Sequence, residues 1–156
     1  MKRQSGFTLL EILVVLAIVG ILSATAVPLY HTWQGRAYGS EAAIMLKQII
    51  GAEINYFLEN NKFFPEDNIY IIPHEGQTQP TDIDVIKKIY DNLHITINQG
   101  HFLDYGLTGF KDEEGNERFT LTIQSRNGDF EIFKGAREVL IELDKDGNTG
   151  FFYPNY

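Results

Sequence analysis

The sequence predicts an α+β protein in which the second half of a long N-terminal helix packs on an antiparallel β-sheet. Two patterns support this class. After a short polar start, the chain has a continuous apolar run, and apolar residues then recur at helical spacing. In the C-terminal half, apolar and polar residues alternate in short runs that turn residues separate. The length of 156 residues leaves room for one compact domain beside such a helix. We therefore expect a short basic segment over 1–6, a helix over 7–60 and an α+β head over 61–156.

Composition excludes several classes of function. The chain has 13 Lys+Arg against 21 Asp+Glu, and its net charge of -8 argues against electrostatic binding to nucleic acid or anionic lipid. It contains no cysteine, which rules out disulfides, thiolate nucleophiles and cysteine-ligated metals. The sequence also lacks G-x-S-x-G, the P-loop and G-x-G-x-x-G. We expect no enzyme activity, no cofactor and no metal.

The predicted helix begins with a segment that can span a membrane. Between Ile12 and Tyr30, 15 of 19 residues are apolar, and no charged residue occurs from Ile12 to Gly35. A run of about 20 apolar residues is long enough to cross a bilayer. The basic residues before it, Lys2 and Arg3, favour an orientation with the N-terminus in the cytoplasm and the rest of the chain outside it.

A cleaved secretory signal is the alternative to a permanent span. The triplet Ala24-Thr25-Ala26 resembles the small-x-small site at which such signals are cut. However, the apolar run is longer than that of an ordinary signal and continues past the triplet. We therefore favour a membrane segment over 7–30.

An acidic residue, Glu11, interrupts the start of this segment. A carboxylate in a spanning helix needs a partner, because burying its charge in hydrocarbon is costly. Glu11 lies four residues after Phe7, so the two side chains share one helix face. Cleavage after Gly6 would give Phe7 an amino group close to Glu11, and the pair could neutralise within one chain or between neighbouring chains. The alternative is an interfacial glutamate favoured by the helix N-terminus.

The run Gly6-Phe7-Thr8-Leu9-Leu10-Glu11, followed by an apolar helix with Gly20 and Pro28, resembles the class III signal of type IV prepilins and type II secretion pseudopilins. The resemblance covers 1–30: a short basic leader ends in Gly, Phe follows, and Glu comes four residues after Phe. Residues 56–65 are also similar to the Tyr…Asn-Gly-x-Tyr-Pro stretch that ends the helix in this family, although two positions differ.

This resemblance implies a type IV pilin ladle and a structural function. A prepilin peptidase would cut between Gly6 and Phe7 and methylate the new N-terminus. Glu11 would then pair with the Phe7 amino group of a neighbouring subunit during docking. The implied partners are other copies of the chain in a helical filament, the peptidase, an inner-membrane assembly platform and, before assembly, membrane lipid. The precursor would cross the inner membrane once with its head outside the cytoplasm, and the product would be a cell-surface filament.

Two other functions remain open. One is a pseudopilin in a periplasmic filament of a type II secretion system, minor rather than major, because the chain lacks the Pro-Trp-Gly segment and the Ser-Leu-Gly-Ala-Asp-Gly-like loop of major pseudopilins. The other is a membrane-anchored binding module that never polymerises. The absence of the disulfide that many type IV pilins carry near the C-terminus counts somewhat against the pilus interpretation.

Beyond the membrane segment, the predicted helix becomes amphipathic. Its apolar stripe recurs at spacings of three and four residues and comprises Ala42, Leu46, Ile49, Ile50, Ile54, Phe57 and Leu58. Lys62 and Pro65 mark the end of the helix. The residues expected to weaken or bend it locally are Gly20, Pro28, Gly35 and Gly39. The aromatic residues typical of a belt at the membrane surface are Tyr30, Trp33 and Tyr38.

In the predicted head, turn residues separate the elements, and the spacing of apolar residues changes from helical to alternating. Residues 65–80 contain three prolines and indicate a surface loop. Thr81 and Asp84 resemble a capping box that opens a short helix with the inward face Ile83, Ile86, Ile89, Tyr90 and Leu93. Alternation then predicts strands over 94–98, 118–125, 129–133, 139–143 and 150–153, with turns at 112–116, 126–128 and 144–148.

Two groups of residues could bind a cation but have simpler explanations. Asp144, Asp146 and Asn148 alternate as in a calcium loop, yet the glycine comes one residue early and the distal Glu is missing, so a hairpin turn is favoured. The four histidines lack metal-ligand spacing, and we expect His94 and His101 to be surface residues.

Overall fold

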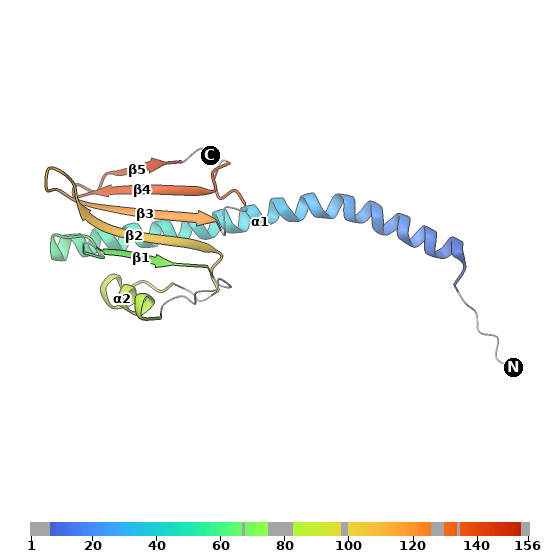
Figure 1. The fold of residues 1–156 in the computed structure, drawn as a ribbon, viewed down its shortest axis with the longest axis horizontal. Coiled ribbons are helices and arrows are strands. Elements are labelled where there is room, and N and C mark those ends of the chain that lie inside the picture. Colours follow the sequence, from blue (N-terminus) through green and yellow to red (C-terminus); the bar gives the residue numbers. More distant parts are fainter. Residues whose placement is uncertain are drawn as a thin grey trace. The chain divides into compact units, whose positions relative to one another are not determined.

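The structure confirms the predicted α+β class: one long helix precedes a five-stranded antiparallel sheet (Figure 1). The computed structural model describes residues 7–66, 68–74, 83–97, 100–125, 130–133 and 135–153. Its elements are α1 (Leu9–Asn60), β1 (Asn68–Ile72), α2 (Ile83–Leu93), β2 (Leu103–Lys111), β3 (Glu117–Ser125), β4 (Glu138–Asp144) and β5 (Thr149–Phe152). Contacts divide the chain into two compact units, Met1–Gln34 and Gly35–Tyr156.

The sheet is a meander in which each strand pairs with the next one along the chain, in the order β1-β2-β3-β4-β5. Alternate residues of its three central strands are buried, as the two-residue period of a strand requires. The buried set comprises Leu103, Tyr105, Leu107, Phe119, Leu121, Ile123, Val139, Ile141 and Leu143. These side chains form one core with the head part of α1, residues 35–60, which lies beside the strands in Figure 1.

The head part of α1 buries one stripe. Ala42, Ile49 and Ile50 are buried there, as the helical spacing predicts. Leu58 was expected in the stripe but is 74% exposed, because it lies in the last turn of the helix at the edge of the core. The belt position expected for Tyr38 is also wrong, since its buried ring stacks on Phe130 with 4.0 Å between centroids.

The short helix α2 also differs from its predicted face. Ile89 and Leu93 are buried as expected, but Ile83 and Tyr90 are exposed. Val85 packs against the core instead, because residues at spacings of four lie on one face of the helix. The predicted capping residue Thr81 lies outside the described residues.

Three of the observed strands, β3, β4 and β5, match predicted strands, whereas β1 and β2 do not. β1 lies in the segment expected to be a loop, and the strand expected over 94–98 is wrong, since 94–97 form no regular structure and residue 98 is not described. In the region 129–133, the described residues contain only an isolated bridge between Phe133 and Ala136. The turn expected at 126–128 lies outside the described residues.

The glycines of β2 make its sequence resemble a loop, and a close backbone contact explains the glycine at Gly109. A Cβ at this position would lie 2.6 Å from the carbonyl oxygen of Pro65 and 3.0 Å from that of Phe63. The Gly109 N–H donates to the same Pro65 oxygen at 3.2 Å. The chain leaving α1 therefore crosses directly over β2, and only glycine leaves room for it.

Candidate functional site

The first turn of α1 is closed by two side chains that cap each other. The backbone N–H and the hydroxyl of Thr8 both donate to Oε2 of Glu11, each at 2.8 Å. In return, the Glu11 N–H donates to the Thr8 hydroxyl oxygen at 3.2 Å. This is a capping box, in which two backbone donors that have no helical partner are satisfied reciprocally. The sequence Thr-x-x-Glu before an apolar run is its signature, so the residue types alone would predict it.

The capping box explains why a carboxylate is tolerated at the start of this helix. Glu11 stabilises the helix N-terminus through hydrogen bonds, as the interfacial interpretation expects. Both bonds from Thr8 go to Oε2. Phe7, four residues earlier, is 84% exposed. Gly6, the other residue of the predicted cleavage site, lies outside the described residues.

The helix that follows has an apolar surface on every side. From Leu9 to Tyr30 its large hydrophobic side chains are exposed within the chain. By length and composition, α1 is the one helix of the described residues that could cross a membrane. Such a surface is unstable in water, because each exposed square ångström of apolar area costs about 25 cal/mol. It must be covered by lipid or by other protein chains.

A second acidic residue of α1, Glu53, is fully buried in the head. Its Oε2 accepts the N–H of Phe64 at 3.0 Å, while Oε1 has no hydrogen-bond partner among the described residues. Burial raises the pKa of Glu53 to about 8, and the bond from Phe64 offsets only part of that shift. Glu53 is therefore a largely protonated acid at neutral pH, and it ties the chain after α1 to the helix.

Two histidines are buried rather than exposed. The surface position expected for His101 is wrong, since its ring Nδ1 lies 2.7 Å from the carbonyl oxygen of Leu103 inside the head. His74 is also buried, and its Nδ1 lies 2.8 Å from Oδ1 of Asp104. His94 is exposed, as expected. The described histidines thus have individual structural partners, and no group of three or more His, Asp or Glu residues in the described part of the chain could hold a metal ion.

Comparison with known proteins supplies the family. A model of the prokaryotic N-terminal methylation motif matches residues 1–27. The type IV major pilin protein PilE1 of Neisseria gonorrhoeae is 45% identical over 149 residues, which cover 94% of this chain and 77% of the relative. The chain belongs to the type IV pilin family.

Other relatives of this pilin carry similar names. The fimbrial protein of Pseudomonas aeruginosa is 34% identical over 103 residues, or 64% of each chain. The type IV major pilin protein PilA of Myxococcus xanthus (strain DK1622) is 41% identical over 61 residues, 39% of this chain and 28% of the relative. No solved structure matches the chain. These relatives are structural proteins, and this pilin is a structural subunit of a pilus rather than an enzyme.

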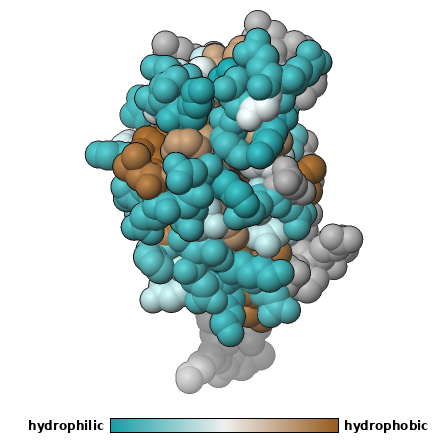
Figure 2. Space-filling view, turned by 90° about the vertical axis from the view of Figure 1, so that its left-hand side faces the viewer, coloured by the Kyte–Doolittle hydropathy of each residue, from teal (hydrophilic) through white to brown (hydrophobic). Residues whose placement is uncertain are grey.

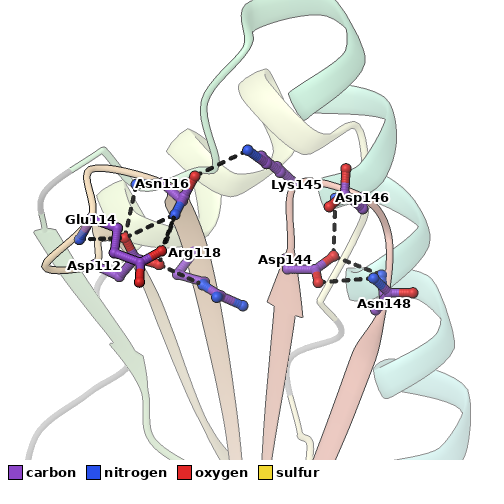
Figure 3. Close-up of polar contacts among 8 residues, drawn as sticks. All are labelled: Asp112, Glu114, Asn116, Arg118, Asp144, Lys145, Asp146 and Asn148. Atoms are coloured by element: carbon purple, nitrogen blue, oxygen red, sulfur yellow. Dashed lines mark hydrogen bonds and ion pairs between the residues drawn. The ribbon is translucent and has the colours of Figure 1, made fainter.

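The pilin head carries the same turn twice. In Asp112–Asn116, Oδ1 of the aspartate accepts the N–H of Glu114 at 3.0 Å and of Asn116 at 2.8 Å. In Asp144–Asn148, Oδ1 of the aspartate accepts the N–H of Asp146 at 2.9 Å and of Asn148 at 2.8 Å. Both turns place a glycine at positive φ. Figure 3 shows the two turns beside each other, joined by a bond from Lys145 Nζ to Asn116 Oδ1.

These bonds account for the residues that resemble a calcium loop. The Asn148 side chain donates to Oδ2 of Asp144 at 2.9 Å, so both oxygens of the aspartate accept bonds within the turn. Those bonds, with that of the Asn148 amide the largest cause, lower the pKa of Asp144, and bonds led by the Asn116 N–H lower the pKa of Asp112. The geometry is that of a self-contained hairpin turn.

Proposed function

We propose that this pilin is cut between Gly6 and Phe7 by a prepilin peptidase, methylated on the new N-terminus and polymerised through α1 into a helical filament. The observation that carries the proposal is the apolar surface that follows Phe7 in the described chain and that is exposed on every side of the helix. Lipid would cover this surface in the precursor, and the helices of neighbouring subunits would cover it in the filament. The methylation-motif match over 1–27 supports the processing step.

Membrane orientation follows from the charges that flank the apolar run. Lys2 and Arg3 would hold the N-terminus in the cytoplasm. The head would then lie outside the cytoplasm, where an inner-membrane assembly platform would take up the subunit. From Gln34 onward the chain has 11 Lys+Arg against 20 Asp+Glu. The filament would therefore have an apolar core and an acidic outer shell.

Glu11 would set the register between subunits. Cleavage creates an amino group on Phe7, which lies just before α1 and next to Thr8, the residue that forms the capping box with Glu11. The capping bonds use Oε2 and hold the carboxylate at the first turn of the helix. Pairing with the amino group of a neighbouring subunit would neutralise both charges in an apolar core. Loss of one partner would leave an uncompensated buried charge, at a cost of about 3–5 kcal/mol.

The head part of α1 also offers a surface for helix packing. Residues spaced by seven along it are exposed and uncharged: Ala37, Ile44, Gly51 and Leu58. A seven-residue repeat keeps one face of a helix directed at a neighbouring helix over its whole length. This stripe supports packing of α1 against other copies beyond the membrane segment.

Mass spectrometry and one pair of variants test the proposal. The mature chain should begin at a methylated Phe7, and Glu11→Ala should reduce surface filaments to background while the precursor accumulates in the membrane. Glu59→Ala, which removes an exposed acid at the other end of α1, is the matched control and should assemble normally. An intact leader in fractionated cells would refute the processing step, and wild-type filament yield from Glu11→Ala would refute the docking role. Loss of protein secretion rather than of filaments on gene deletion would favour a pseudopilin.

A further inference from the structure

The head part of α1 contains a glycine that its own chain does not explain. Glycine in a helix interior lowers stability relative to alanine, because its backbone loses more freedom on folding. Gly39 has a reason within the chain, since a Cβ there would lie 2.8 Å from the carbonyl oxygen of Ile132. A Cβ on Gly51 would meet no described atom within 4 Å. The open space beside Gly51 is therefore suited to a close neighbour from outside the chain.

Gly51 lines a groove on the surface of the head. One wall of the groove is α1 from Ile44 to Asn55, and the opposite wall runs from Leu93, at the end of α2, to Thr96. The groove has a volume of about 740 Å³. This is about five times the volume of an apolar cavity that holds one benzene molecule. Several side chains of a partner therefore fit into the groove.

No charged side chain lines the groove, although the chain as a whole is acidic. The ten lining residues include no Asp, Glu, Lys or Arg, whereas the whole chain has 13 Lys+Arg and 21 Asp+Glu. The exposed charges of the neighbouring elements lie outside the lining: Lys47 on α1 and Lys87, Lys88 and Asp91 on α2.

The length of this uncharged surface defines what can lie in the groove. Along α1 it is bounded by Glu41, whose carboxylate accepts hydrogen bonds within the head, and by exposed Glu59. The helix between these two acids is about 27 Å long at about 1.5 Å per residue. A partner needs an uncharged surface of about this length, because burying a charge without a counter-charge is costly.

We propose that this groove receives residues 9–34 of α1 from another subunit of the filament, a contact that rests on the proposed polymerisation. No charged residue occurs from Ile12 to Gly35, an uncharged stretch of about 36 Å at about 1.5 Å per residue. It exceeds the length that the groove requires, and its large apolar side chains are exposed on every side. The groove and this helix are different surfaces of identical subunits. Such a contact repeats without closing, which produces a fibre.

Polar side chains of the two surfaces match in their spacing. In the groove, Gln48 and Asn55 are exposed and lie seven residues apart on one face of α1. In residues 9–34, Thr25 and Thr32 are exposed and also lie seven residues apart. Each threonine hydroxyl donates to a carbonyl of its own helix, at 3.0 Å for Thr25 and 3.1 Å for Thr32, and its oxygen can still accept an amide N–H. In parallel helices, placing Thr25 beside Gln48 therefore places Thr32 beside Asn55.

Three considerations select a helix as the occupant. The same register brings Pro28 to Gly51, where the missing side chain leaves room for the proline ring, whereas a flexible lipid tail adapts to a Cβ and does not require glycine. An extended segment would need partners for its backbone N–H and C=O groups, which a helix satisfies internally. Another head offers no long apolar surface at the end shown in Figure 2, where hydrophilic residues surround small hydrophobic patches.

Disulfide cross-linking in the full-length chain tests this register directly, because the chain has no cysteine of its own. We would express Thr25→Cys together with Gln48→Cys in cells that assemble filaments, and oxidise the sheared filaments. A disulfide forms only where the two Cα atoms can approach to about 4.4–6.8 Å. The expected result is a ladder of covalent multimers on a non-reducing gel, which a reductant collapses to monomer.

A matched pair separates this register from chance contacts. Thr25→Cys with Asn55→Cys moves the second cysteine to the other exposed amide position of the groove, about 10 Å along α1 at about 1.5 Å per residue. This pair should give no ladder, and each single cysteine should give dimers at most. Abundant filaments without a ladder from the Gln48 pair, or equal ladders from both pairs, would overturn the contact and leave the proposed function intact. Failure of the cysteine-free chain to form filaments would instead refute the proposed function itself.

Filling the space at Gly51 tests the groove without cysteine. Gly51→Leu should weaken the subunit contact about tenfold or more through overpacking, while cleavage at Phe7 stays unchanged. The urea midpoint of the head should not fall, because leucine favours a helix over glycine and no described atom lies within 4 Å of the added Cβ. Ala43→Leu adds bulk at an exposed position of α1 outside the groove and should assemble normally. Unchanged filament yield from Gly51→Leu, a lower urea midpoint of that variant, or an equal loss of filaments from Ala43→Leu would contradict the contact.

Discussion

The two halves of α1 show how one helix serves two environments. In residues 9–34 the apolar side chains surround the helix and none of them is buried, whereas in residues 35–60 they form a stripe that packs into the head. The acids of the two halves differ in the same way, since Glu11 caps an exposed helix end and Glu53 is fully buried. A helix that is apolar all round depends on partners outside its own chain, while an amphipathic one is stabilised by its own domain.

Matched isoleucine substitutions should show the difference between the two halves most strongly, through the stability of the head. Ile49→Ala leaves a cavity in the head core and should lower the free energy of unfolding of the head by about 2–5 kcal/mol. Ile18→Ala, in the exposed half, should leave that free energy unchanged. Pulse proteolysis of the detergent-solubilised full-length chain in urea measures both. Equal destabilisation by the two variants would mean that the halves do not differ as described.

The buried acid Glu53 should make the stability of the head depend on pH. Folded Glu53 keeps its proton up to a pKa of about 8, whereas unfolded Glu53 releases it near the usual value of about 4.3. Unfolding therefore releases a proton between these values, and the free energy of unfolding should fall by a few kcal/mol as the pH rises from about 5 to about 8. The pKa values of Asp112 and Asp144 are lowered, so their titration affects the stability of the head only at lower pH.

Glu53→Gln supplies the control for this titration. The variant cannot ionise, so its urea midpoint should stay nearly constant across the same pH range, while that of the parent chain falls. A parent midpoint that rises with pH would contradict a protonated Glu53. Glu11→Gln should leave the pH profile of head unfolding as it is in the parent, because Glu11 belongs to the other half of the helix.

Alanine substitutions at two glycines of α1 should change the stability of the head least. Their effects should differ, because only one of the two glycines has close neighbours. A Cβ on Gly39 would lie 2.8 Å from the carbonyl oxygen of Ile132, whereas a Cβ on Gly20 meets no described atom within 4 Å. Alanine favours a helix by up to about 1 kcal/mol over glycine, but overpacking costs about 1–3 kcal/mol. Gly39→Ala should therefore destabilise the head by about 1 kcal/mol. Gly20→Ala should leave head unfolding unchanged, and a stabilised Gly39→Ala would show that the loop at Ile132 moves aside.

Sequence patterns predicted those elements whose residue types and spacing are typical of the helix or strand that they form. The continuous apolar run and the later stripe identified α1, and alternation identified β3, β4 and β5. β1 and β2 were missed because their sequences carry signals of loops: β1 lies next to Pro65 and Pro73, and β2 contains Gly106 and Gly109. Gly109 is explained only by the chain that crosses over it, a contact far apart in sequence that no local pattern contains.

The functional region shows a similar division. The motif around Gly6, Phe7 and Glu11 is evident from residue types and spacing, and the Thr8-x-x-Glu11 spacing carries the signature of the capping box. Burial of Glu53 could not be predicted from local sequence, since a glutamate beside an apolar stripe normally faces solvent. Its place in the core depends on the Phe64 N–H, which reaches it only after the chain has turned back on itself.

The repeated Asp-x-x-Gly-Asn turn has a consequence for how this surface can evolve. Its shape depends on the first aspartate, the glycine at positive φ and the last asparagine. The two positions between aspartate and glycine are exposed and differ between the turns, being Glu-Glu in one and Lys-Asp in the other. Substitutions there can change the charge of the tip while the backbone is preserved, so lineages could diversify this exposed patch without selection against misfolded heads.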